Sequence, residues 1–148
     1  MEFRRASVRD IDSMITMRKR QLVDEGLAPE LDIDDELLKY FTARLQDHSL
    51  VQWLAEDQGA IVATAAIVFF AFPPSYVNKT GVKGYVTNMY TAPMYRGRGI
   101  AAQMLRRLTD EAQARGVRRI LLAASEMGKP VYKKFGFEQA DEWMELIL

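Results

Sequence analysis

The chain has 148 residues, of which 49% are hydrophobic and 27% charged, and its formal net charge is zero. These values fit one globular domain over residues 1–148, and the neutral balance argues against a polyanion partner such as DNA or RNA. The chain has no cysteine and a single histidine, His48, which excludes disulfides, a thiol nucleophile and a histidine-based metal cluster.

Two stretches bear on location. The N-terminal sequence MEFRRASVRD is charged within its first five residues and lacks an apolar signal-peptide core. The longest apolar run, residues 60–72, is too short to cross a bilayer as a helix, and its β-branched and aromatic residues favour a buried strand. We therefore expect a cytoplasmic protein without a membrane partner.

The first half of the chain alternates between strand and helix patterns. Asp10 or Asp12 can cap the first helix. The predicted elements are, in order, a strand at 2–8, a helix to about residue 23, an acidic loop at 24–36, a helix through 37–45, and two strands at 50–57 and from Ala60 that are joined by a tight turn.

The second half begins with a polar excursion at 72–81. The predicted elements that follow are a strand at 82–91, a helix to about Arg115, a short strand at 117–125, a short helix at 128–135 and a last strand at 142–148. This order predicts an α/β (α+β) fold, with a mixed, mostly antiparallel sheet covered by helices on both faces.

The loop MYRGRGIAAQML, residues 94–105, carries the strongest functional signal. Gly97 and Gly99 let the backbone approach a ligand closely, Arg96 and Arg98 add positive charge, and the start of a helix presents unpaired N–H groups. Together these features predict a pyrophosphate site. A tight turn with surface arginines is the alternative. The loop lacks the P-loop pattern, and it lacks the full Rossmann pattern.

The same segment resembles the acyl-CoA binding motif of the GNAT superfamily of N-acetyltransferases. Arg96, Gly99 and Ala101 occupy the positions of its [RQ]-x-x-G-x-[GA] loop, and residues 131–137, VYKKFGF, resemble the family's closing Y-x-x-x-G-F segment. The order of elements also matches, so the resemblance covers nearly the whole chain. It implies a sheet that is splayed between its fourth and fifth strands.

The resemblance implies acetyl-CoA as the acetyl donor, with no metal. In the family, main-chain groups at the end of strand four contact the pantetheine arm and the thioester, and the loop amides bind the pyrophosphate. The positions implied here are Met89, Tyr90 and Thr91 for the arm, and Arg96, Gly97, Arg98, Gly99, Ile100 and Ala101 for the pyrophosphate.

Two residues are candidates for the chemistry. Tyr132 occupies the position of the family's general-acid tyrosine, although it could instead be a packing aromatic. Because a tyrosine ordinarily titrates above a thiol, we expect it to donate a hydrogen bond to the leaving thiolate rather than a full proton. Ser125 stands where many relatives have an asparagine, and capping the next helix is an equal alternative.

The general base and the acceptor stay open. Strand 82–91 contains no acid, and Asn88 could only orient a water. Glu126 or a carboxylate of the loop at 24–36 is a candidate, and that loop either attracts a cationic amine or is a solvated loop with Asp34 capping the second helix. The excursion at 72–81 could cover the acceptor pocket or form a dimer contact.

The sequence thus predicts an N-acetyltransferase that acts on a small-molecule or protein amine by direct attack, because no cysteine can carry the acetyl group. Dimers are common in the family, so a homodimer is one option. The alternative is an acyl-CoA-binding sensor or regulatory module without catalysis.

Overall fold

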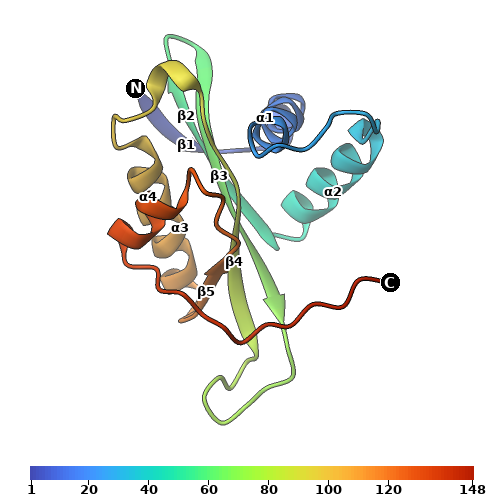
Figure 1. The fold of residues 1–148 in the computed structure, drawn as a ribbon, viewed down its shortest axis with the longest axis vertical. Helices are drawn as coiled ribbons and strands as arrows, with labels where there is room; N and C mark the ends of the chain where they lie inside the picture. Colours follow the sequence, from blue (N-terminus) through green and yellow to red (C-terminus); the bar gives the residue numbers. More distant parts are fainter.

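A single five-stranded sheet with the order β1-β2-β3-β4-β5 organises the computed structural model, which describes residues 1–148 (Figure 1). Neighbouring strands are antiparallel except β4 and β5, which are parallel. The strands are β1 (Glu2–Arg5), β2 (Leu50–Asp57), β3 (Ala60–Ala71), β4 (Val82–Thr91) and β5 (Ile120–Leu122). The predicted mixed, mostly antiparallel sheet is confirmed.

Helices cover both faces of the sheet (Figure 1). Two helices pack on one face, α1 (Ile11–Asp24) and α2 (Asp34–Gln46), and two on the other, α3 (Ile100–Ala114) and α4 (Lys129–Phe135). Two short 3-10 turns, η1 (Val8–Asp10) and η2 (Pro93–Tyr95), precede α1 and α3. None of these helices has the length and apolar character that a membrane span requires.

Alternate side chains of β3 build the two halves of the core. Ala63, Ala65 and Ile67 are fully buried in the larger cluster, together with the apolar stripe of α3, whereas Ala66 is buried in a smaller cluster under α1 and α2. Period-two alternation in a strand covered on both faces explains this division. The apolar stripe of α3 is buried at Ile100, Met104, Leu105, Leu108 and Ala112, whereas Ala101 is only half-buried.

A β-bulge interrupts β4 near its end. Thr87 pairs with Ala66 and Tyr90 with Thr64, so that two residues of β4, Asn88 and Met89, lie opposite one residue of β3. Asn88 has the left-handed φ of 53° and is buried, and its amide donates to Gln52 Oε1 at 3.1 Å. Gln52 in turn donates to the Thr64 hydroxyl. The bulge is therefore held by a chain of side-chain hydrogen bonds that runs from β4 to Gln52 of β2 and on to Thr64 of β3.

Three predicted strands differ from the structure. The opening strand ends at Arg5, and the strand predicted at 117–125 is reduced to Ile120–Leu122, because β5 pairs with β4 over three residues only. The strand predicted at 142–148 is wrong: no sheet hydrogen bonds form there, and the apolar residues of that segment are exposed. A strand pattern becomes a strand only where a neighbour supplies hydrogen-bond partners.

An ion pair closes the junction between β1 and α1. Arg4 donates two hydrogen bonds to the Asp10 carboxylate, at 3.0 and 2.8 Å, and the Ser7 main-chain N–H adds a third at 2.8 Å. Mainly through the hydrogen bonds from Arg4, the pKa of Asp10 is lowered from 3.8 to about 2. Asp10 therefore serves the turn before α1 rather than the helix cap that the sequence suggests, since its side chain caps no N–H of α1.

We expect Asp10→Asn to lower the free energy of unfolding at neutral pH by about 1–2 kcal/mol, a value reduced for the partial exposure of Arg4. A lowered folded-state pKa gives stability that is complete above about pH 4 and is lost as the pH falls toward 2. In urea unfolding, the difference in the free energy of unfolding between the variant and the wild type should therefore become smaller as the pH falls from about 4 to 2. Asp12→Asn, at an exposed position of α1, is the control and should show no such pH-dependent difference.

Candidate active site

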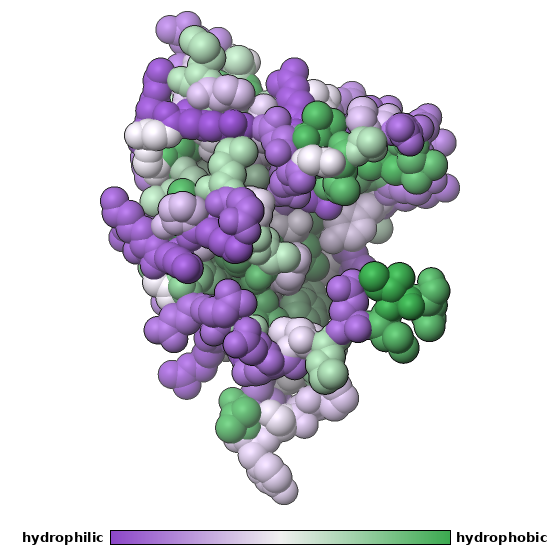
Figure 2. Space-filling model, viewed as in Figure 1, coloured by the Kyte–Doolittle hydropathy of each residue, from purple (hydrophilic) through white to green (hydrophobic).

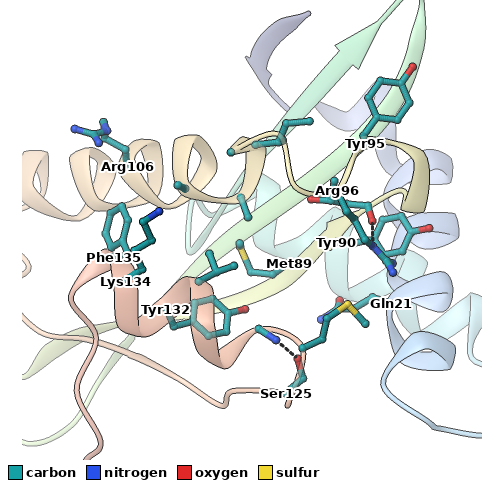
Figure 3. Close-up of a pocket in the computed structure, with 18 of the residues that line it drawn as sticks. Gln21, Met89, Tyr90, Tyr95, Arg96, Arg106, Ser125, Tyr132, Lys134 and Phe135 are labelled. Atoms are coloured by element: carbon teal, nitrogen blue, oxygen red, sulfur yellow. Dashed lines mark hydrogen bonds between the residues drawn. The ribbon is translucent and has the colours of Figure 1, made fainter.

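A cleft of about 850 Å³ opens where β4 separates from β5 (Figure 3). The two strands pair only at Gly84–Val86 with Ile120–Leu122, so the last residues of β4 have no neighbour on that side. Four elements line the cleft: the end of α1, the end of β4, the loop and first half of α3, and α4 with the turn before it. The splay between the fourth and fifth strands that the sequence implies is thereby confirmed.

The loop between η2 and α3 presents free main-chain donors. Gly97 and Gly99 have left-handed φ angles of 74° and 75°, a conformation that costs other residues about 1–2 kcal/mol. The N–H groups from Gly97 to Ala102 donate to no acceptor of the chain, and the first helical hydrogen bond runs from Gln103 to the Gly99 carbonyl. Six consecutive donors are therefore available to an anion at the positive end of the α3 dipole.

The side chain of Arg96 fixes this loop rather than pointing freely toward a ligand. Its Nε donates to the Thr91 carbonyl at 2.9 Å, and its Nη2 pairs with Asp24 at 2.5 Å, which ties the loop to the end of α1. Arg98 lies over the Tyr95 ring at 5.0 Å. Of the nine predicted cofactor positions, Arg98 alone does not line the cleft; the others do, namely Met89, Tyr90, Thr91, Arg96, Gly97, Gly99, Ile100 and Ala101.

Tyr132 brings one polar group into an apolar wall of the cleft. Its side chain is 92% buried between α4 and the core, and its hydroxyl points into the space beside Met89 and Gln21 (Figure 3). Burial, reinforced by the negative charge of Glu25, raises the pKa of Tyr132 to about 12. The hydroxyl therefore keeps its proton at neutral pH and is a hydrogen-bond donor.

Gly128 makes room for the Tyr132 ring. A Cβ atom at this position would lie 2.6 Å from the ring edge of Tyr132 and 3.2 Å from the Ser125 hydroxyl. Ser125 lines the cleft, but its hydroxyl accepts from the Gly128 N–H at 3.1 Å and so closes the turn that begins α4. Ser125 therefore holds the turn before α4 and does not cap the helix, whose N-cap is Gly128 without a side-chain cap hydrogen bond.

The acidic end of the cleft is the part that sequence reasoning did not resolve. Of the seven acids between residues 24 and 36, only Asp24 and Glu25 line it, and Asp24 is paired with Arg96. Glu25 accepts from the buried Gln21 amide at 3.0 Å. The helical phase of α1 could have indicated this, because Gln21 and Glu25 follow the buried Met14 and Met17 on one face.

The remaining candidates lie elsewhere. Glu126 is exposed, does not line the cleft, and pairs with Lys129, which lowers its pKa. Asn88 is buried in the bulge and does not line the cleft. Asp34 does not cap α2; it is the first residue of that helix and pairs with Lys19. His48 is exposed and lines no cleft, as expected.

The excursion at 72–81 does not cover the cleft. It joins β3 to β4 at the end of the sheet opposite the η2–α3 loop (Figure 1). The other end of the cleft, between α3 and α4, carries the cations Arg106 and Lys134 together with Asp110. No group of three or more acidic or histidine side chains is arranged to hold a metal ion.

The family model described as the acetyltransferase (GNAT) family matches residues 12–137. The chain belongs to the GNAT family. This range contains the loop with the free amides, Tyr132 and all of the cleft, and it confirms the resemblance found in the sequence. The chain is accordingly an enzyme of the N-acetyltransferase class.

Relatives support the same assignment. The chain is similar to a predicted acetyltransferase from Clostridium acetobutylicum solved with acetyl-CoA, with 54% identity, a TM-score of 0.96, and coverage of 99% of this chain and 95% of that one. It is 27% identical to the mouse thialysine N-epsilon-acetyltransferase over 97% of this chain and 84% of that enzyme. It is also 27% identical to glucosamine 6-phosphate N-acetyltransferase of Trypanosoma brucei brucei over 63% of this chain, and it spans 61% of that enzyme's length.

The effect of the Glu25 charge on the pKa of Tyr132 should be measurable. We expect a Tyr132 pKa of about 12 in a titration of ¹³Cζ-labelled tyrosine followed by NMR, and a lower value in Glu25→Gln, because a negative charge disfavours the phenolate. Tyr132→Phe assigns the resonance. Glu30→Gln removes an exposed carboxylate of the same loop outside the cleft and should leave the titration unchanged. An unchanged value in Glu25→Gln would refute the electrostatic link.

Proposed function

We propose that the protein, acting as a single domain over residues 1–148, transfers the acetyl group of acetyl-CoA to a primary amine by direct attack in a ternary complex. The observation that carries this proposal is the joint placement on one cleft of the Tyr132 hydroxyl and of five residues with free main-chain N–H groups, namely Gly97, Gly99, Ile100, Ala101 and Ala102. The free N–H groups suit a diphosphate, and the hydroxyl suits a leaving thiolate.

The residues of the cleft fit the donor along its length. The amides from Gly97 to Ala102 would hold the diphosphate, with Arg106 and Lys134 adding positive charge beyond it. Met89 and Thr91, at the unpaired end of β4, would border the pantetheine arm, with main-chain groups that no strand on the β5 side occupies. Bound in this way, acetyl-CoA supplies an activated thioester next to Tyr132.

Tyr132 supports departure of the thiolate by donating a hydrogen bond to the sulfur. A thiol ordinarily titrates near 8.5, so a full proton transfer from a group at about 12 would be uphill by about 5 kcal/mol. The negative charge that develops on sulfur is instead stabilised by the hydroxyl dipole at a site largely shielded from water. The released thiolate takes its proton from solvent.

The acceptor enters from the acidic end of the cleft. Glu25 is the one cleft carboxylate at that end that no arginine or lysine pairs with, and its charge reaches Tyr132. A protonated primary amine would bind there and lose a proton to Glu25 or to a water held by it. The mouse relative is named for an amine acceptor, thialysine, which agrees with a cationic alkylamine as the substrate class.

A sensor module that binds acyl-CoA without turnover is the alternative. Release of free CoA thiol with a panel of diamines, amino acids, aminoglycosides and lysine peptides, with product masses recorded, separates the two. Acetylation of at least one cationic amine supports the enzyme. Tight binding of acetyl-CoA with no acetylated product from any member of the panel would favour the module.

The left-handed conformation of the loop at Gly99 should control the binding of acetyl-CoA. We expect Gly99→Ala to weaken acetyl-CoA and CoA binding at least about tenfold in calorimetry, because the left-handed turn that aims the amides costs alanine about 1–2 kcal/mol. Gly116→Ala is the matched control: Gly116 has a φ of 71° at the other end of α3, outside the cleft. It should cost similar stability and leave binding unchanged. Acetyl-pantetheine, which lacks the diphosphate, should not respond to Gly99→Ala.

The hydroxyl of Tyr132 should act on turnover rather than on binding. We expect Tyr132→Phe to lower kcat by about a hundredfold while the Kd of acetyl-CoA changes little, because the lost hydrogen bond forms to the charged leaving group. Tyr40→Phe changes a distant exposed tyrosine of α2 and serves as the control. An unchanged kcat in Tyr132→Phe would remove the hydroxyl from the mechanism.

A further inference from the structure

Three arginines of the chain are half-buried, and Arg18 of α1 is the one among them without a charged or aromatic partner. Arg4 pairs with two carboxylates, and Arg107 lies over two aromatic rings. Arg18 forms one side-chain hydrogen bond, from its Nη1 to the side-chain oxygen of Gln21 at 3.1 Å. Most of the N–H donors of its guanidinium therefore have no acceptor in the chain. Withdrawing a cation from water without an anion is unfavourable, so this group is suited to bind one.

Gln21 joins Arg18 to Glu25 along one face of α1. The three residues follow one another at spacings of three and four, which places them on the same side of the helix. Gln21 is 7% exposed; its oxygen accepts from Arg18, and its nitrogen donates to Glu25 Oε1 at 3.0 Å. A buried neutral amide thus separates a positive from a negative group by two hydrogen bonds. We call these three residues the α1 row.

The negative end of the α1 row lies beside the position of the proposed reaction. Gln21 and Glu25 line the cleft, and the charge of Glu25 acts on the Tyr132 hydroxyl. Gln21 and Tyr132 border the same space in Figure 3. Arg18 lies one turn earlier on α1, outside the cleft wall, and is partly exposed. A molecule bound with its amine at Glu25 can therefore extend past Gln21 to Arg18.

The charges next to the α1 row are already paired. Asp24 pairs with Arg96, and Lys19 pairs with Asp34. Hydrophilic and hydrophobic residues are interspersed over the part of α1 and α2 that is seen in Figure 2, so this surface offers no uniform patch that would select the acceptor. Selection therefore falls to the α1 row, whose two ends carry opposite charges.

We infer that the acceptor is an amine that also carries a carboxylate, with its ammonium group at Glu25 and its carboxylate at Arg18. This inference rests on the proposed function, since it adds a second contact to the acceptor of the same cleft. The planar guanidinium matches a carboxylate through two parallel hydrogen bonds, and the two charges of the α1 row complement those of an amino acid. Arg18 determines specificity and takes no part in the chemical step.

The test compares amines that differ only in the charge of the second group. The probes are β-alanine, γ-aminobutyrate and ε-aminocaproate, each with its neutral carboxamide, so that three distances between amine and carboxylate are covered. For at least one of them we expect kcat/KM to exceed that of the carboxamide at least about tenfold, mainly through KM, because only the carboxylate forms charge-assisted hydrogen bonds on both sides. Calorimetry of the same compounds with the CoA complex repeats the comparison without turnover.

Variants of α1 assign the preference to one side chain. Arg18→Gln should bring the ratio between carboxylate and carboxamide to about one, with the Kd of acetyl-CoA unchanged. Arg18→Lys keeps the charge without the planar fork and should restore part of the preference. Arg20→Gln removes an exposed cation of the same helix and is the matched control, in which the preference should persist. A merely structural role of Arg18 would lower the activity with both compounds alike.

The outcomes separate this inference from the proposed function. Acetylation of carboxamides and amino acids at equal rates by the wild type, or a preference that survives Arg18→Gln, would overturn the inference and leave the proposed function intact. If no amine reacts, the proposed function fails, and calorimetry still reports on the carboxylate contact. Equal binding of the carboxylates and carboxamides to the CoA complex would then overturn the inference as well.

Discussion

Six main-chain N–H groups that the fold leaves without acceptors are the feature around which the rest of this structure is arranged. They persist because left-handed glycines at 97 and 99 keep the chain from continuing the helical hydrogen bonds backward. The buried stripe of α3 fixes the helix behind them, and Arg96 ties the loop to α1. β4 ends where it separates from β5, and the loop follows directly, so the free N–H groups lie at the cleft.

The electrostatics of the cleft divide its length into three parts. Arg106, Lys134 and the free amides lie at the α3 end of the cleft, and Glu25 lies at the end of α1. Between them is Tyr132, whose burial keeps it protonated. This order matches a phosphorylated donor, a neutral thioester and a cationic acceptor. The same burial that makes Tyr132 a poor proton donor would strengthen the hydrogen bond that we propose it donates to the thioester sulfur, because a buried hydroxyl meets little competing water.

The sequence predicts the elements that local pattern decides. β3, β4 and α3 follow from their apolar periods, and the loop follows from its glycines. The bulge at Asn88 does not, because it depends on Gln52 and Thr64 in other strands. Gln21 and Glu25 line the cleft because of how α1 lies over β4, which is a tertiary contact that local pattern does not determine. Residues 142–148 have the alternation of apolar residues that is typical of a strand. They form no strand, because no neighbouring strand of the chain supplies hydrogen-bond partners.

Chemical-shift mapping of the ¹⁵N-labelled protein tests the central claim most directly. On addition of CoA, the amide resonances of residues 97–102 should shift most, since these N–H groups gain acceptors where they now have none. The amides at the far end of α3, near Gly116, should stay in place. Saturating binding that leaves residues 97–102 unmoved would show that the diphosphate lies elsewhere and would contradict this account.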